Sequence, residues 1–498
     1  MTRASTENLR LHGISLGSDE IVEHFPRRRL AVCTDSFSSE LALNWVAVFC
    51  AGAVIGLQMI SPETRVLSYA GLIALTVFRM RGPVEALSLS TFAILANDGL
   101  APAAPALVYL KWILLAVCAV KLTFTHKIYS KPALRAQRAI TIFTIAIAFL
   151  ALATSSNPTL SIWKLLSWFL GVQVVIAALS DPGTKAAYWL SWLYSLYVSS
   201  LVASASIYFL PVGRWLNGRG FQGVFSHPQS FGIYLAPFTA VLTAELFTSR
   251  KLRWHNVAIM ILGWVLLFAS LCRTAVLAIP LGLTAALIGG LVSRRISIKG
   301  QLNGNTLARA CGLLGMLTVF VILSGEDLRD ELGSFLKKGR PTYEQSVVFD
   351  KGGIADSRES LILPQLEQFA TKPLAGNGFG IAPEGIMQDV QSGDFHGIPL
   401  SAPIEPGYLP VALLAQMGII GTMAWMFWFL PLSFWVSSKT SLGISILFWT
   451  AMFTQLGEAS FFSFGGLGLQ FWLLIGLSIR MSTERHRPHF SRWQGFIH

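Results

Sequence analysis

The residues best suited to chemistry in this chain are arginines that border apolar runs. Arg273 stands in LCRTA, between two such runs, so its guanidinium must lie near the level of a membrane. A cation there needs a partner, and the planar guanidinium suits a phosphate, which it can bind with two hydrogen bonds. The alternative is an arginine at a helix end whose charged head reaches water. We therefore predict an anion site at Arg273.

A second candidate is the turn GRGFQGVFSHPQSFG. Its glycines let the backbone approach a ligand closely, and a helix starting near Pro228 would direct its positive N-terminal end at an anion. Arg219 supplies a cation, His227 supplies a titratable group, and Arg214 competes with Arg219 for the cationic role. An ordinary outer turn with an interfacial arginine explains the same residues equally well.

The segment 324–405 is the one long run too polar to lie in lipid. Leucines recur at helical spacing in its sequence DSRESLILPQLEQF, which predicts an amphipathic helix lying on a neighbouring surface, with Arg358 near its start. The glycines of GNGFG, which follows, predict a tight turn, because the strand and helix of a nucleotide-binding fold are missing around them. We expect the segment to be a functional loop with short helices.

Two groups at the end of this segment could take a proton. His396 is the segment's only histidine, and a base that titrates near neutral pH suits the activation of a hydroxyl group. Glu405 offers a carboxylate for the same role. A lone loop histidine is more often incidental, and most loop carboxylates are merely solvated. Glu458, at the outer end of an apolar run, is either a helix-end carboxylate or a partner for one of the arginines.

The elements that must position these residues are membrane helices. The 498 residues are 53% hydrophobic and only 13% charged, which excludes an ordinary soluble protein. The net charge of +12 falls in short clusters between apolar runs, the pattern of a membrane topology signal, so we expect no nucleic-acid partner. The five cysteines show no paired metal-ligand spacing, and we expect neither a metal nor another cofactor.

We predict an all-α polytopic membrane protein with about 14 transmembrane helices, each near the roughly 20 residues that a bilayer needs. The first helix would serve as an uncleaved insertion signal. Basic clusters place both termini in the cytoplasm and the long loop on the opposite face. The expected divisions are a tail at 1–40, helices 1 to 11 at 41–323, a periplasmic loop at 324–405, helices 12 to 14 at 406–480 and a tail at 481–498.

The order GRGFQGVFSHPQSFG, LCRTA, a long outer loop with SRESL and PLAGNGFG, then GYLPVALLAQMGIIG resembles the O-antigen ligase and Wzy-type polymerase superfamily. The resemblance covers about residues 200 to 425, and the earlier third matches only as apolar spans. It implies a GT-C-like glycosyltransferase of the bacterial inner membrane that acts at the periplasmic face without a metal or a nucleotide sugar. The arginines that hold the donor diphosphate would be Arg219, Arg273 and Arg358.

The same resemblance implies an undecaprenyl diphosphate-linked saccharide donor and a glycan or lipid-linked acceptor, among membrane lipids and polysaccharide assembly proteins. One departure matters: the histidine that the ligases carry falls on Gly407. His396 or Glu405 would then replace it, or the chemistry differs, and we favour a polymerase of O-antigen or exopolysaccharide repeat units over a ligase that acts on lipid A core. A transporter or a scaffold of polysaccharide assembly is the alternative of another class.

Overall fold

The structure is a computed structural model that describes residues 41–104, 107–125, 130–214, 220–248, 253–293, 356–381, 394–395, 398–399 and 407–484. Within these ranges the chain is helical, except for a hairpin of two-residue strands, β1 (Asp394–Phe395) and β2 (Ile398–Pro399). The predicted all-α fold is therefore confirmed for the described residues.

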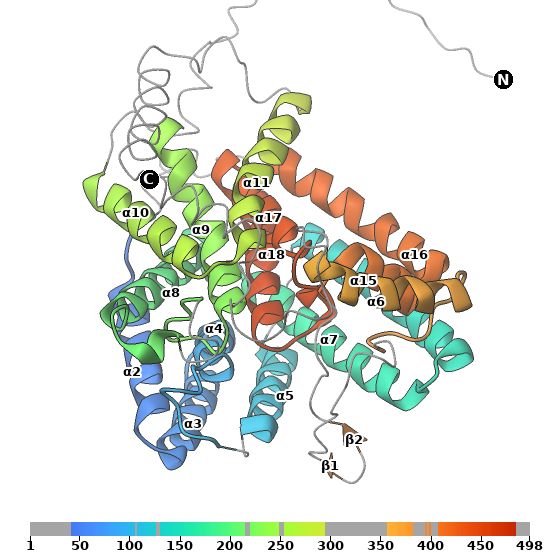
Figure 1. Ribbon diagram of the computed structural model, residues 1–498, viewed down its shortest axis with the longest axis horizontal. Coiled ribbons are helices and arrows are strands. Elements are labelled where there is room, and N and C mark those ends of the chain that lie inside the picture. Colours follow the sequence, from blue (N-terminus) through green and yellow to red (C-terminus); the bar gives the residue numbers. More distant parts are fainter. Residues whose placement is uncertain are drawn as a thin grey trace, which may run out of the picture.

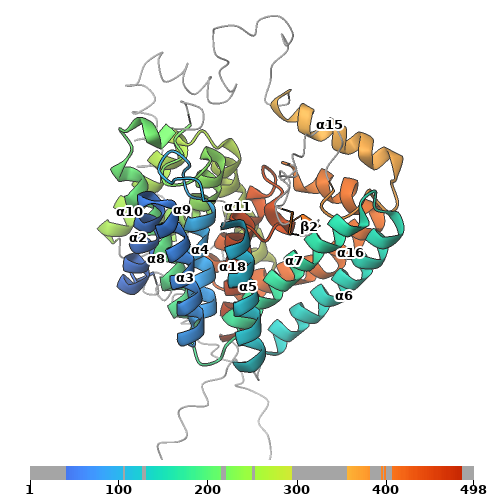
Figure 2. The same ribbon diagram turned by 90° about the horizontal axis from the view of Figure 1, so that it is seen from below.

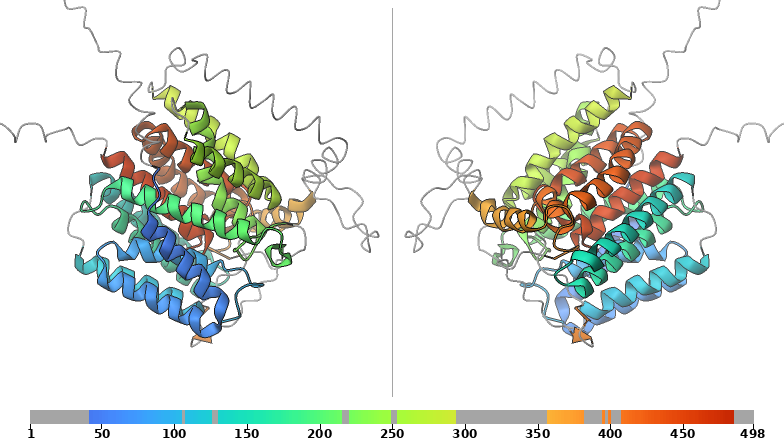
Figure 3. Two further views of the ribbon diagram at one scale, coloured as in Figure 1. Left: turned by 90° about the vertical axis from the view of Figure 1, so that its left-hand side faces the viewer. Right: turned by 90° about the vertical axis from the view of Figure 1, so that its right-hand side faces the viewer.

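Most helices of the described chain form one bundle (Figure 1). They are α2 (Trp45–Ile60), α3 (Pro62–Phe78), α4 (Gly82–Ile94), α5 (Leu107–Thr125), α6 (Lys131–Thr154), α7 (Pro158–Leu179), α8 (Ala186–Ser206), α9 (Pro228–Thr248), α10 (Trp254–Ala269), α11 (Arg273–Val292), α16 (Leu409–Lys439), α17 (Leu442–Thr454) and α18 (Leu467–Glu484). A further helix, α15 (Asp356–Thr371), lies at the margin of the bundle against α16 (Figures 2 and 3). Two 3-10 turns of the described chain, η2 (Pro211–Arg214) and η3 (Ser460–Phe462), lie in the connections between helices.

Short polar residues start several of these helices where the apolar runs begin. Ser61 and Thr64 form a reciprocal capping box at the start of α3, and Asn157 accepts a hydrogen bond from the Leu160 N–H at the start of α7. Proline occupies the first turn of both helices, where a backbone N–H would have no acceptor within the helix, so the N–H that proline lacks is not missed. Local sequence thus fixes where these helices begin.

Helices α2 to α11 alternate in direction, as do α16 to α18, so their connections gather at two opposite ends. The basic end is formed by residues 79–82 and 181–186 with the end of α18. The loop end is formed by residues 95–104, 207–214, 220–227, 269–273, 372–381 and 455–466 with the start of α16. The described parts of GRGFQGVFSHPQSFG, LCRTA and GNGFG and the turn at Glu458 therefore all lie at the loop end. The face of a membrane to which each end belongs remains a prediction.

Charged side chains are paired at the basic end. Glu85, at the start of α4, is completely buried. Its carboxylate forms an ion pair with Arg79 at 3.2 Å and accepts a hydrogen bond from the Tyr188 hydroxyl at 2.6 Å. Arg480 of α18 donates both to the Thr184 carbonyl, at 2.9 Å, and to Glu484, at 2.8 Å. These bonds tie the end of α3 to the starts of α4 and α8, and the end of α18 to the α7–α8 connection.

Apolar side chains are exposed around the perimeter of the bundle. Large exposed residues lie along α2, α3, α5, α6, α10, α11 and α16, and Phe49, Phe78, Phe149 and Phe427 are among the most exposed. An apolar surface of this extent is not stable in water, and it fits lipid. In contrast, α4, α9 and α18 are buried along almost their whole length. The core is therefore a set of central helices enclosed by a lipid-facing ring, consistent with a helical membrane protein.

The structure places a helix at each predicted span except that at 307–323, which lies outside the described residues. Five of the described helices, α6, α7, α9, α11 and α16, are long and apolar enough to cross a membrane. The number of crossings thus remains a prediction. Helix α4 is only 13 residues long, yet it needs no match to the bilayer thickness because neighbouring helices cover it on all sides.

Candidate functional site

The connection between α10 and α11 is a tight turn at residues 270–272. Leu271 has φ 55°, the left-handed region, and it is the one non-glycine residue with a positive φ in the described ranges. The Ser270 hydroxyl accepts a hydrogen bond from the Cys272 N–H at 3.3 Å. Helix α11 then begins at once with Arg273, which is partly buried. The turn therefore fixes the backbone that carries the predicted anion-binding arginine.

The start of α9 lies beside this turn. The Phe221 N–H donates to the Ala269 carbonyl at 2.8 Å, and the Cys272 thiol contacts the Gln229 carbonyl at 3.7 Å. Gly232, in the first turns of α9, is so close to Cys272 that a methyl group at this glycine would overlap with the cysteine side chain. The two predicted outer turns, GRGFQGVFSHPQSFG and LCRTA, are therefore neighbours in the structure.

The turn before α9 is held from a third side by Asn97. This residue follows α4, and its buried side-chain amide donates to the Gly223 carbonyl at 2.7 Å and to the Val212 carbonyl at 3.0 Å. Its backbone N–H donates to the Val224 carbonyl at 3.0 Å. The position of the α9 start thus depends on a residue more than 100 positions earlier in the chain.

The two helix starts and Arg273 each contribute positive charge to this end of the bundle. Neither α9 nor α11 has an acidic residue in its own first turn, and Glu458 lies in the turn whose Gly457 contacts Thr274 of α11. Arg273 adds a full positive charge at the first residue of α11, a position where a helix dipole disfavours a cation. An anion bound here would be stabilised by all three groups.

The starts of α11 and α16 both contact the turn that follows α17. Gly457 is in contact with the side chain of Thr274, the second residue of α11. The Leu409 N–H donates to the Gln455 carbonyl at 3.2 Å, which places Gly407, two residues before α16, on the same side of the bundle. Glu458 is partly buried in this turn. The structure thus brings Arg273, Glu458 and Gly407 to the same end of the bundle.

The predicted turn at GNGFG is confirmed, and it pairs with a break in α16. At Gly418 the backbone has φ 61° and ψ −168°, which interrupts the helix. The Asn377 and Gly378 N–H groups donate to the carbonyls of Ala415 and Gln416, both at 3.0 Å. On the other side of the break, the N–H groups of residues 419 and 420 donate to the carbonyls of residues 373 and 374, at 2.9 and 3.1 Å. We call this pairing of residues 373–378 with residues 415–420 the clasp.

The clasp satisfies backbone groups that the helix break would otherwise leave unpaired in an apolar environment. Phe379, the next residue, is buried against the rings of Trp168 and Phe462, at centroid distances of 6.2 and 5.1 Å. Lys164 of α7 donates to the Gly380 carbonyl, and the Gln416 side chain accepts from the Gly380 N–H at 2.9 Å. The polar loop is thus anchored to α7, α16 and η3.

The helix predicted after Asp356 is confirmed as α15, and protein covers its glutamine flank rather than its leucine flank. The leucines were expected to lie on a neighbouring surface, whereas Leu363 and Leu366 are exposed and Gln365 is buried. The structure describes the backbone of Arg358 in the first turn of α15, and the side chain of Arg358 lies outside the described residues.

Arg214 has a structural role in the loop end. Its guanidinium donates to the Tyr208 carbonyl at 3.0 Å and lies over the rings of Tyr208 and Phe221, 5.1 and 5.6 Å from the centroids. These contacts use the charge to hold the turn between α8 and α9. We therefore do not include Arg214 in the proposed anion site.

His227 lies at the start of α9, where its Nδ1 accepts a hydrogen bond from the Gln229 N–H at 3.1 Å. A neutral ring that accepts at Nδ1 carries its proton at Nε2, so this histidine can donate from Nε2. Its position next to the α9 start keeps it among the candidate binding residues.

Three other predicted site residues, Arg219, His396 and Glu405, lie outside the described residues. Gly220, which follows Arg219, is buried against Pro228 and the Ser270 carbonyl. Glu405 precedes Gly407 by two residues in the sequence. Gly220 and Gly407, the described residues nearest in sequence to Arg219 and Glu405, thus both lie at the loop end, as does Arg273.

Sequence reasoning missed three residues that organise the bundle ends. Lys164 and Gln416 hold the turn at Gly380, and Glu85 pairs with Arg79. The available signal was an ionisable residue inside an apolar run, as with Lys164 in LSIWKLLSW and Glu85 in GPVEALSL.

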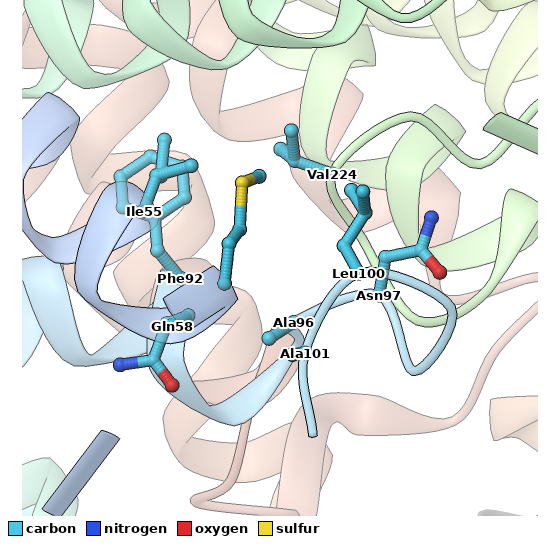
Figure 4. Close-up of a pocket in the computed structure, with 9 residues that line it drawn as sticks. Ile55, Gln58, Phe92, Ala96, Asn97, Leu100, Ala101 and Val224 are labelled. Carbon is cyan, nitrogen blue, oxygen red and sulfur yellow. The ribbon is translucent and has the colours of Figure 1, made fainter. Parts of the chain in front are cut away.

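A small cavity lies at the loop end between α2, α4 and the turn at Val224 (Figure 4). Its volume is about 10 Å³, enough for at most one water molecule, so no sugar or phosphate fits. Its lining consists of Ile55, Gln58, Met59, Phe92, Ala96, Asn97, Leu100, Ala101 and Val224. Within the described residues, no three His, Cys, Asp or Glu side chains gather where they could bind a metal ion.

No protein-family model matches the chain, and no curated protein matches it. The arguments on function therefore rest on the arrangement at the loop end.

Proposed function

We propose that the protein is a membrane glycosyltransferase that polymerises oligosaccharide repeat units linked to undecaprenyl diphosphate, acting at the periplasmic face of a bacterial inner membrane. The observation that carries the proposal is the convergence of the α9 and α11 starts at Arg273, with no acidic residue in either first turn. A lipid-linked diphosphate is an anion at the level of the membrane surface, which is what such a site would bind.

The reaction would be an inverting transfer. An acceptor hydroxyl oxygen bonds to the anomeric carbon of the donor sugar while the bond from that carbon to the diphosphate oxygen breaks, and the electron pair leaves with the lipid diphosphate. Arg273 and the two helix starts would stabilise the charge that develops on this leaving group. Arg219 and Arg358 are the further cations that the proposal assigns to the diphosphate.

The acceptor proton needs a base. Gly407 cannot serve, and the proposal assigns the role to Glu405 or His396. The start of α16 is bonded to Gln455, in the turn whose Gly457 touches the second residue of α11. A base carried just before α16 would therefore stand on the same side of the bundle as Arg273.

The decisive experiment is turnover of purified protein in lipid nanodiscs with a lipid-linked repeat unit as the substrate. We expect Arg273→Ala to lower the rate about 100-fold, the usual effect of removing a group that stabilises transition-state charge. Arg273→Lys should restore part of this loss because it keeps the charge but not the two-pronged geometry. The control is Arg138→Ala, which removes an exposed arginine from α6, near its basic-end start.

Normal turnover in Arg273→Ala would refute the diphosphate site. Conversion of repeat units into longer lipid-linked chains would support the polymerase, whereas transfer of a finished chain to lipid A core would identify a ligase. The absence of a histidine at Gly407 favours the first outcome. Movement of the lipid-linked glycan across the bilayer with no new glycosidic bond would instead identify a transporter.

A further inference from the structure

Helix α15 exposes leucines and buries a glutamine. Leu363 and Leu366 are 49% and 41% exposed, and Leu374, just beyond the helix, is 62% exposed, whereas Gln365 is only 1% exposed. Successive residues of a helix are about 100° apart around its axis, so Leu363, Leu366 and Ala370 share one flank of the exposed surface. Glu367 and Thr371 are also exposed, and they lie on the adjoining flank. One side of the exposed surface is therefore apolar and the other polar.

The apolar flank of α15 continues into the lipid-facing surface of α16. The clasp joins Leu374 directly to Ile420, whose N–H donates to the Leu374 carbonyl at 3.1 Å. Ile419, Ile420 and Met423 are exposed, and they begin the apolar stripe that runs along α16. The leucines of α15 thus lie at one end of a surface that already fits lipid.

The length of α16 places the clasp at the edge of the bilayer. The helix has 31 residues, which at about 1.5 Å per residue is about 46 Å, longer than a hydrocarbon core of about 30 Å. The residues after Gly418, from 419 to 439, number 21 (439 − 418) and span about 31 Å, which matches the core. The break at Gly418, and the clasp with it, therefore falls where the apolar core ends.

We propose that α15 is an interfacial helix that lies in the head-group layer beside α16, with Leu363, Leu366 and Leu374 in the acyl chains and Glu367 and Thr371 in water. Exposed leucines are costly in water, and they become stabilising when an amphipathic helix lies at the boundary of the acyl chains. The surrounding lipid is thus a partner of the loop as well as of the membrane helices. The inference depends on the membrane position of α16 and not on any catalytic activity.

The test is collision accessibility of nitroxide labels in nanodiscs of phosphatidylethanolamine and phosphatidylglycerol. Single cysteines would replace Leu363, Leu366 and Leu374 in a full-length background whose five native cysteines are substituted, with Glu367→Cys and Thr371→Cys as the matched controls. All five positions are exposed, so the label should not disturb packing. The native thermal midpoint of the background would show that the chain still folds.

We expect the ratio of oxygen to nickel-chelate accessibility to be at least about 5-fold higher at the three leucine positions than at the two controls. Equal ratios at all five positions would place the leucines in water and overturn the proposal. Shielding of the leucine positions from both reagents would also overturn it, because a second protein surface, from another copy or another chain, would then cover them.

Discussion

The Asn377 N–H donates to the carbonyl of Ala415 at 3.0 Å, so a turn of the polar loop supplies a hydrogen bond to a broken membrane helix. Three more bonds of the clasp do the same for neighbouring groups around Gly418. The loop and the helix break are therefore parts of one structure, and removing either leaves backbone groups of the other unpaired.

The glycines of the clasp should be sensitive to the smallest substitution. Gly376 and Gly418 have φ 70° and 61°, and a methyl group on either would overlap with the backbone of the facing segment. We expect Gly376→Ala and Gly418→Ala each to lower stability by about 2 to 4 kcal/mol, measured as unfolding in mixed micelles. Gly71→Ala is the control, since a methyl group there meets no atom and alanine favours a helix. Equal stability of the three variants would show that the clasp contributes little.

Phe379 should hold the loop through its ring. Removing a buried phenylalanine side chain costs about 3 to 5 kcal/mol when the cavity cannot collapse, and this ring is packed against Trp168 and Phe462. Phe379→Ala should therefore increase protease cleavage within residues 356–381. The control is Phe427→Ala, which removes an equally large ring from the lipid-facing surface of α16 and should leave the cleavage pattern unchanged.

Asn97 should be required for the stability of the turn before α9. Asn97→Ala leaves the carbonyls of Val212 and Gly223 without the amide donor, and each unpaired buried group costs about 1 to 3 kcal/mol. We expect a lower thermal midpoint and faster hydrogen exchange in residues 220–227, followed by mass spectrometry. The neighbouring substitution Asp98→Asn changes an exposed side chain and should have neither effect. Normal exchange in Asn97→Ala would mean that the turn is held by its other contacts.

The free energies of unfolding of Arg79 and Glu85 variants should not be additive, because the two side chains form an ion pair at the basic end. Arg79→Ala leaves the carboxylate of Glu85 buried with the hydrogen bond from the Tyr188 hydroxyl, so we expect the free energy of unfolding to fall by about 2 kcal/mol or more. Adding Glu85→Gln removes the charge and should recover part of that loss. A double-mutant cycle from unfolding midpoints measures the effect. Additive losses in the two single variants would show that the pair does not interact in the folded protein.

Hydropathy was sufficient to locate the helices, because a span needs only a run of apolar residues. The sequence was less informative about helix ends. The apolar run predicts a span at residues 139–155, yet α6 begins at Lys131, because a helix can continue beyond the apolar run through exposed basic residues such as Arg135 and Arg138. The break in α16 was also not predicted, since GIIG within an apolar run does not show which glycine departs from helical geometry.

The candidate site was predictable in part. Chain order and alternating direction were enough to place the turns at Arg273, His227 and Glu458 at one end of the bundle. The burial of Gln365 and the exposure of Leu363 were not predictable, because helical periodicity identifies two faces of a helix without showing which one contacts protein. The use of Arg214 to hold a turn could not be distinguished from ligand binding by residue type alone.

The hydrogen bonds of the clasp join backbone to backbone, so they tolerate change in the amino-acid sequence of the two paired segments. A backbone bond does not depend on the identity of the side chain, so most residues of the two paired segments could change while the four bonds remain. Only the glycines are restricted, because the facing backbones leave no room for a side chain. Two proteins could therefore share this joint between loop and membrane helix and have little more in common there than the spacing of a few glycines.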